Sequence, residues 1–220
     1  MNTGDKMQEH RIQELKAKLL ESAALIQQML SLAMIQLNPK ESSSFDEVMA
    51  LEARVNELEL KNDTLAINLI ALFQPEAKDL RRIMMMFRIN SDLERLGDQA
   101  VNIAESARHL QSYELDFPDI WQMQEATMEM LTNSITAFLN EDTDAATAVC
   151  ANDNIIDAFN RAIYDRVLTG IKGDSAHAER YLHVLRIAKN LERIGDLATN
   201  IAENTVYLAL GRVIKHNQEL

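Results

Sequence analysis

The chain has 220 residues, a net charge of −12 at neutral pH and 47% hydrophobic residues, with only 6 glycines and 3 prolines. This hydrophobic content is enough for a buried core, whereas the acidic charge argues against nucleic acid and anionic lipid, whose phosphates would repel it. The longest apolar runs that we find are five residues, far short of the ~20 that span a membrane. The N-terminal segment has no apolar signal region, and a single Cys150 fits a reducing compartment, so we expect a cytoplasmic protein.

Six long helices are predicted from the spacing of apolar residues and from the helix-breaking residues between them. They span roughly residues 7–37, 45–74, 75–113, 119–139, 142–169 and 174–210. Ser44 and Glu47 form an S-x-x-E capping box for the second helix, and Pro75 suits the first turn of the third, where its missing N–H costs nothing. Gly170 and Gly173 flank the turn into the sixth. The sequence therefore predicts an all-α fold.

Two segments, 98 residues apart, are nearly identical. Residues 89–105 read INSDLERLGDQAVNIAE and residues 187–203 read IAKNLERIGDLATNIAE, which match at 11 of 17 positions. A fixed internal period indicates a duplicated structural unit. Each copy falls on the third helix of its half, so we predict two tandem antiparallel three-helix bundles, residues 1–115 and 116–220.

Each copy of the repeat carries a row of polar side chains opposite its apolar stripe. The rows consist of Glu94, Asp98, Asn102 and Glu105 in the first copy, and of Glu192, Asp196, Asn200 and Glu203 in the second. Acids four residues apart repel by ~0.2–0.5 kcal/mol on a bare helix, and Gly97 and Gly195 each cost about 1 kcal/mol relative to alanine. A bound cation would offset the first penalty, and close approach of another backbone or a ligand would explain the second.

Neighbouring predicted helices add oxygen ligands to these rows. The candidate metal ligands are Asp153, Asp157, Glu192, Asp196 and Asn200 in the second half, and Glu52, Asn56, Glu94, Asp98 and Asn102 in the first. Such a set suits hard cations such as magnesium, calcium or manganese and permits iron, whereas tight zinc binding is disfavoured. Because Asn56 is neutral, we expect the C-terminal site to bind first. The alternative is a solvated acidic face, since charge belongs opposite a core.

The two LER(L/I)GD…NIAE segments resemble the PhoU family, the accessory regulators of phosphate-specific transport. Residues 74–81, QPEAKDLR, are similar to that family's QP-x-A-x-DLR segment at the start of the third helix. The resemblance covers essentially the whole chain and implies the family fold of two three-helix bundles. It also implies the metal motif E(D)-x-x-x-D, here Glu94/Asp98, Glu192/Asp196 and Asp153/Asp157, while Asn56 departs from a fourth pair after Glu52.

The resemblance further implies a non-enzymatic homodimer that binds magnesium, manganese or iron ahead of calcium or zinc. Such a protein would couple a phosphate ABC transporter, through its ATPase or permease, to the sensor histidine kinase of the phosphate regulon as a negative regulator. It would meet the membrane only through these partners. Two other classes remain open: a structural helical adaptor without metal, and a carboxylate-metal hydrolase. The hydrolase lacks a general base other than the ligands themselves.

Overall fold

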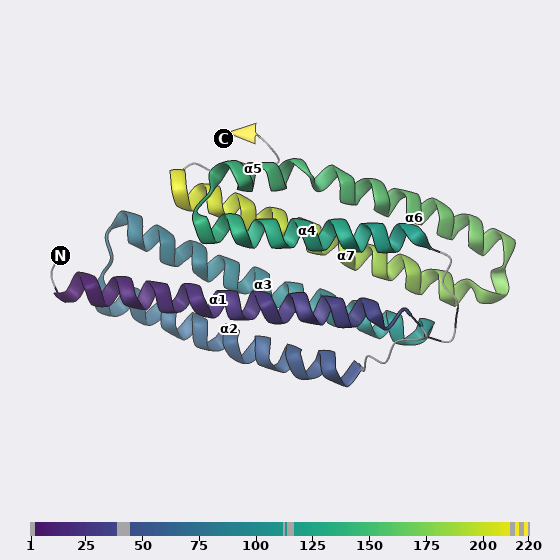
Figure 1. Cartoon of the computed structure of the whole chain (residues 1–220), viewed down its shortest axis with the longest axis horizontal. Coiled ribbons are helices and arrows are strands. Elements are labelled where there is room, and N and C mark those ends of the chain that lie inside the picture. The colour runs from purple at the N-terminus through teal and green to yellow at the C-terminus, as the bar shows by residue number, and fades with distance from the viewer. Residues whose placement is uncertain are drawn as a thin grey trace.

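The computed structural model describes residues 3–38, 45–111, 113, 117–211, 214–215 and 218–219 (Figure 1). Its helices in chain order are α1 (Thr3–Ile35), α2 (Phe45–Phe73), α3 (Ala77–Leu110), α4 (Pro118–Asn140), α5 (Thr143–Ala151), α6 (Asp153–Gly173), the 3-10 helix η1 (Ser175–His177) and α7 (Ala178–Leu210). The two-residue strands β1 (Ile214–Lys215) and β2 (Gln218–Glu219) pair antiparallel. The predicted all-α fold is confirmed.

The helices form two elongated bundles that lie side by side (Figure 1). Helices α1, α2 and α3 pack against one another, and α4, α5 and α6 all pack against α7. The main contact between the halves is made by α3 and α7, the two helices that carry the repeat. This arrangement matches the predicted pair of bundles.

The fifth predicted helix, residues 142–169, is two helices in the structure. Helix α5 ends at Ala151 and α6 begins at Asp153, with Asn152 as the joint. Asn152, Asp153 and Asn154 are all weak helix formers, because their side chains compete for backbone hydrogen bonds. The prediction of one continuous helix was therefore wrong at a point where three unfavourable residues coincide.

The starts of the third and sixth predicted helices also differ from the prediction. Pro75 precedes α3 by two residues, since Glu76 caps the helix and Ala77 begins it, so Pro75 is not in the first turn. Gly170 and Gly173 belong to α6 rather than flanking the turn, which is made by η1. The Ser44 half of the expected capping box lies outside the described residues.

The predicted apolar stripes of the repeat are buried. Leu93, Leu96, Ala100 and Ile103 on α3, and Leu191, Ile194, Ala198 and Ile201 on α7, all belong to one core that draws on every α-helix. A Cβ added at Gly97 would meet Val55 and Met29 at 3.7 and 3.8 Å, and one at Gly195 would meet Ile156 at 3.4 Å. All of these neighbours are side chains of the same bundle, so a close backbone from another element is not what places glycine there.

Helices α3 and α7 are antiparallel. The end of α3 contacts the start of α7, where the rings of His109 and His183 stack with centroids 4.4 Å apart. The start of α3 meets the end of α7, where Arg81 packs on Gly211. This antiparallel pairing of equivalent helices is compatible with a two-fold axis that relates the duplicated halves and runs perpendicular to α3 and α7.

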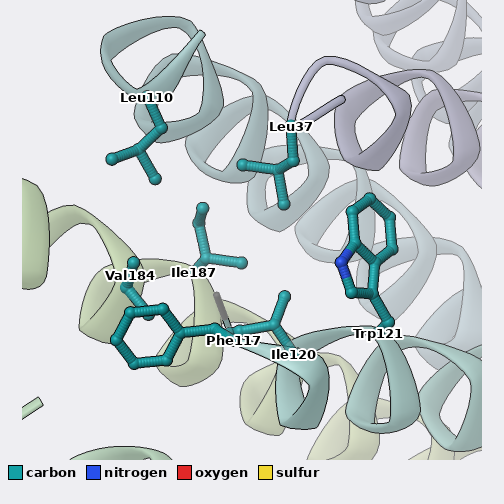
Figure 2. Close-up of a pocket in the computed structure, with 7 residues that line it drawn as sticks. All are labelled: Leu37, Leu110, Phe117, Ile120, Trp121, Val184 and Ile187. Carbon is teal, nitrogen blue, oxygen red and sulfur yellow. The ribbon is translucent and has the colours of Figure 1, made fainter. Parts of the chain in front are cut away.

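Apolar residues of both halves close the space between the bundles. Figure 2 shows Leu37 and Leu110, from the first bundle, facing Ile120, Val184 and Ile187 of the second across a narrow apolar pocket. The two halves therefore share part of their core.

Candidate metal-binding clusters

The C-terminal cluster forms where α6 packs on α7. Ile156 lies against Gly195 and so brings its flanking residues Asp153 and Asp157 beside the polar row of α7. Partial burial raises the pKa of Asp196, and the negative charges of Glu192, Asp153 and Asp157 raise it further. The four acids selected from the sequence in this half therefore lie within electrostatic reach of one another.

Basic side chains already neutralise part of this cluster. Lys189 Nζ lies 2.7 and 2.5 Å from the two carboxylate oxygens of Glu192. Arg161 Nη1 lies 3.8 Å from Asp157 Oδ2. Asn200, one turn beyond Asp196, is half-buried. A cation entering this cluster would compete with these two basic groups.

The N-terminal cluster lies between α2 and α3. Burial raises the pKa of Glu94, and the charges of Asp98, Glu59 and Glu52 add to that effect. Asn56 does not face the acids as an open ligand, because its Nδ2 donates to Glu52 Oε1 at 2.5 Å. The acids selected from the sequence in this half are also brought together.

Asn102 is turned elsewhere. Its Oδ1 accepts from Arg186 Nη2 at 3.3 Å, and the same nitrogen donates to Glu105 Oε2 at 3.0 Å. Arg186 belongs to α7, so the far end of the first polar row takes part in the contact between the bundles. Asn102 therefore takes part in a hydrogen bond between the two halves and does not point toward Glu94 and Asp98.

Glu59 is a member of the N-terminal cluster that the sequence reasoning missed. Burial raises its pKa, and Asp63 and Asp98 raise it further. The available signal was the continuation of the α2 row, since Glu59 and Asp63 follow Glu52 at seven and eleven residues, spacings that keep one helix face. With Glu59 the N-terminal half has four carboxylates as well, which removes the difference in acid count that the sequence suggested.

The donor chemistry fits a hard cation, while the side chains are spread along the helices. Every member of both clusters offers oxygen, the ligand type of magnesium, manganese and iron sites. Within the residues that the structure describes, no three carboxylate, imidazole or thiol side chains converge closely enough to hold a metal ion. Binding would therefore require rotation of these side chains toward a common centre.

Comparison with known proteins identifies relatives of the whole chain. A family model described as the PhoU domain matches residues 19–107 and 120–205, one range in each bundle. Proteins named phosphate-specific transport system accessory protein PhoU homolog are 34% identical in Burkholderia sp and 34% identical in Aquifex aeolicus. The matches cover 91% of this chain and 87% of the Burkholderia protein, and 93% of this chain and 94% of the Aquifex protein.

Two solved structures share the fold. The crystal structure of PhoU from Pseudomonas aeruginosa superposes with a TM-score of 0.88 at 27% identity, covering 92% of this chain and 99% of that one. The phosphate transport system regulatory protein PhoU from Streptococcus pneumoniae gives a TM-score of 0.85 at 25% identity, covering 94% and 99%. The similarity thus extends over both bundles.

Proposed function

The chain belongs to the PhoU family, and we propose that it is a non-enzymatic, metal-binding regulator of phosphate uptake and phosphate-starvation signalling. Relatives over nearly its whole length are named accessory proteins of the phosphate-specific transport system, and a structural neighbour is named a regulatory protein of that system. In this proposal the chain couples a phosphate ABC transporter, through its ATPase or permease, to the sensor histidine kinase of the phosphate regulon. It represses the starvation response when phosphate is plentiful.

The proposal of metal binding rests on the two acidic clusters, which lie at equivalent places in the two halves. Each draws carboxylates from two helices, and in each the pKa of at least one member is raised by burial and by its acidic neighbours. Such crowding destabilises the unliganded acids, and a divalent ion would relieve it. This oxygen set suits magnesium, manganese and calcium and permits iron, whereas tight zinc binding is disfavoured, and the family resemblance ranks magnesium, manganese and iron ahead of calcium.

In this proposal the chain reaches the membrane only by binding the protein subunits of the transporter. In the described part of the chain, no helix has both the length and the apolar character to cross a membrane. Helix α2 exposes large apolar side chains, with Leu60 67%, Ile67 59% and Leu72 76% exposed. Exposed apolar side chains of this size suit burial against another protein. We include in the proposal that the chain forms a homodimer. Sedimentation equilibrium at micromolar protein tests this part, and the 24.9 kDa monomer mass alone would contradict it.

Calorimetric titration with Mn(II), and with Fe(II) under anaerobic conditions, tests the metal proposal. Saturable binding is expected in the parent chain, with weaker binding after Asp196→Asn in one cluster and after Glu59→Gln in the other. Glu129→Gln, which removes an exposed acid of α4 that belongs to neither cluster, is the matched control and should bind as the parent does. Absence of a binding heat in the parent chain would remove metal from the proposal.

The regulatory part is tested in cells. A strain lacking this gene should express a phosphate-starvation reporter in phosphate-rich medium, and the intact gene should restore repression. Affinity purification should recover the transporter ATPase or the kinase. Constitutive repression without the gene would contradict the assigned role.

A metal-free helical adaptor is the second candidate, and one observation favours it. Lys189 and Arg161 already pair with Glu192 and Asp157, so the chain itself supplies counter-charges to the C-terminal cluster. The two candidates differ in the titration above, because an adaptor would retain its partners while binding no metal.

A further inference from the structure

A second site lies at the other end of the C-terminal bundle, away from the acidic clusters. It is a pocket of about 470 Å³ between α6 and the first turn of α7, closed on one side by Phe117. Two arginines, Arg166 and Arg180, line it. Such a pair of guanidinium groups is a potential anion site, provided that acids of the chain do not already neutralise it.

Arg180 is held by rings instead of acids. Its guanidinium carbon lies 5.5 Å from the centre of the Tyr113 ring and 5.3 Å from that of Tyr181. Among the described residues it forms no ion pair, and its Nε is buried without a hydrogen-bond partner. Stacking engages the flat face of a guanidinium and leaves its in-plane N–H groups available as donors. Arg180 is therefore fixed in place with its charge and donors largely unused.

The internal repeat supplies a comparison for this residue. The 98-residue offset that aligns the two copies places Arg180 on Arg82. Arg82 pairs with three acids, at 2.8 Å from Glu141, 3.6 Å from Glu9 and 3.8 Å from Asp79. The role of Arg82 is therefore to form ion pairs within the chain. The arginine of the second copy has no such partners and faces a pocket.

Several residues hold the pocket open in a fixed shape. A Cβ at Gly170 would lie 2.3 Å from the Tyr181 ring, so only glycine lets that ring rest against α6. The Tyr181 ring in turn packs edge-on against Phe117, with centroids 6.2 Å apart, and the guanidinium of Arg166 lies 5.2 Å from the centre of the Phe117 ring. Glycine is less favourable than alanine inside a helix, and here it lets the Tyr181 ring, against which Arg180 packs, rest on α6.

We propose that this pocket binds a phosphoryl group, either as free phosphate or on a small phosphorylated molecule. The planar fork of arginine matches phosphate oxygens, and the pocket volume falls in the range of small-molecule sites. Asp119 Oδ2 accepts from Arg166 Nη1 at 3.1 Å, and Asp165 also lines the wall, so the anion would be bound chiefly by the N–H groups of Arg180, which pair with no acid among the described residues. The inference is independent of metal binding, which involves other residues.

A neighbouring pocket of the same size does not share these features. It is lined by Arg161 and Lys189, and each of these already pairs with an acid of the C-terminal cluster. Its positive charge is therefore neutralised within the chain, and we assign it no anion.

The test is calorimetric or NMR titration of the intact chain with inorganic phosphate and, separately, with adenosine monophosphate. Saturable binding of at least one is expected, and Arg180→Gln should weaken it by about tenfold or more, as expected for loss of charged hydrogen bonds. Arg54→Gln, at an exposed arginine of α2 that makes the same change in net charge, should bind as the parent does. Binding of both ligands would identify the phosphate itself as the determinant, whereas binding of the nucleotide alone would show that the attached group is required.

Two further variants separate recognition from folding. Arg180→Lys keeps the cation but loses the planar fork, so it should retain the thermal stability of the parent and bind more weakly. Gly170→Ala removes no charge but displaces the Tyr181 ring, so it should also weaken binding. The proposal fails if neither ligand binds saturably, if Arg180→Gln binds like the parent, or if Arg54→Gln loses as much affinity. Selective binding of an acidic peptide in place of both phosphates would assign the pocket to a protein partner instead.

Discussion

Asp92 shows how packing changes the chemistry of one residue. Its side chain is only 14% exposed, and burial raises its pKa to about 6 although Arg95 lies 3.6 Å away and Arg88 also favours the charged form. The desolvation of the carboxylate thus outweighs two positive neighbours. Because the folded pKa lies above the ordinary value of 3.8, folding favours the protonated form. This residue therefore lowers stability progressively as pH rises from about 3.8 to about 6, and its penalty is constant at higher pH.

We predict that Asp92→Asn stabilises the chain at neutral pH. A pKa raised from 3.8 to about 6 corresponds to at most about 3 kcal/mol above pH 6. The gain should shrink as pH falls below 6, because the native Asp92 then becomes protonated and resembles asparagine. Urea unfolding at pH 7.5 and pH 5.0 measures the difference, with the exposed acid variant Glu129→Gln as control. A gain that is equal at both pH values would contradict the assigned titration.

Cys150 should be unreactive in the folded chain. It is 5% exposed, and burial, with smaller contributions from Glu203 and Asp153, raises its pKa to about 11. Since the thiolate is the reactive form, native labelling by iodoacetamide at pH 8 should be at least about 100-fold slower than labelling of the urea-unfolded chain. Mass spectrometry over time gives both rates. Rapid native labelling would show that α5 opens readily.

At the scale of the elements, sequence patterns predicted helices well and their joints poorly. The stripes of α3 and α7 were recoverable because apolar residues repeat at helical spacing. The joint at Asn152 was missed because weak helix formers lower helix stability without setting where a helix ends, which depends on packing. Glu59 was missed although its spacing from Glu52 keeps it on the same face of α2. The spacing places it on that face, whereas its approach to Asp98 depends on how α2 packs on α3.

The two repeat glycines should respond differently to alanine. A Cβ at position 97 would make ordinary contacts at 3.7 Å or more, so Gly97→Ala should stabilise α3 by about 0.5–1 kcal/mol through helix propensity. A Cβ at position 195 would meet Ile156 at 3.4 Å, the near limit of ordinary contact, so Gly195→Ala should gain less stability. Urea unfolding of the two variants gives the comparison. If Gly195→Ala is the more stable, local packing does not decide their difference.

At the scale of the whole molecule, the duplicated halves are joined by a shared interior. A small apolar pocket is lined by Leu19 and Ile89 from the first bundle and by Phe138 and Ile201 from the second. A second apolar pocket, shown in Figure 2, is also lined by residues of both bundles. Separating the bundles would expose these side chains to water, at a cost of roughly 25 cal/mol for each Å² of apolar surface. The division at residues 115 and 116 therefore remains a prediction. We expect the stability of each half to depend on the other.

The shared interior predicts that the intact chain unfolds as one unit. The single tryptophan, Trp121, lines the pocket between the bundles, so its fluorescence reports on their separation, while circular dichroism reports on the helices of both halves. If the halves support each other, urea transitions followed by the two signals should coincide within error. A separated segment of residues 117–211 should then keep helical signal but lose a cooperative transition, because the α7 face that packs on α3 is left exposed. A fluorescence transition that clearly precedes the loss of helix, together with cooperative unfolding of the separated segment, would instead show two independent domains.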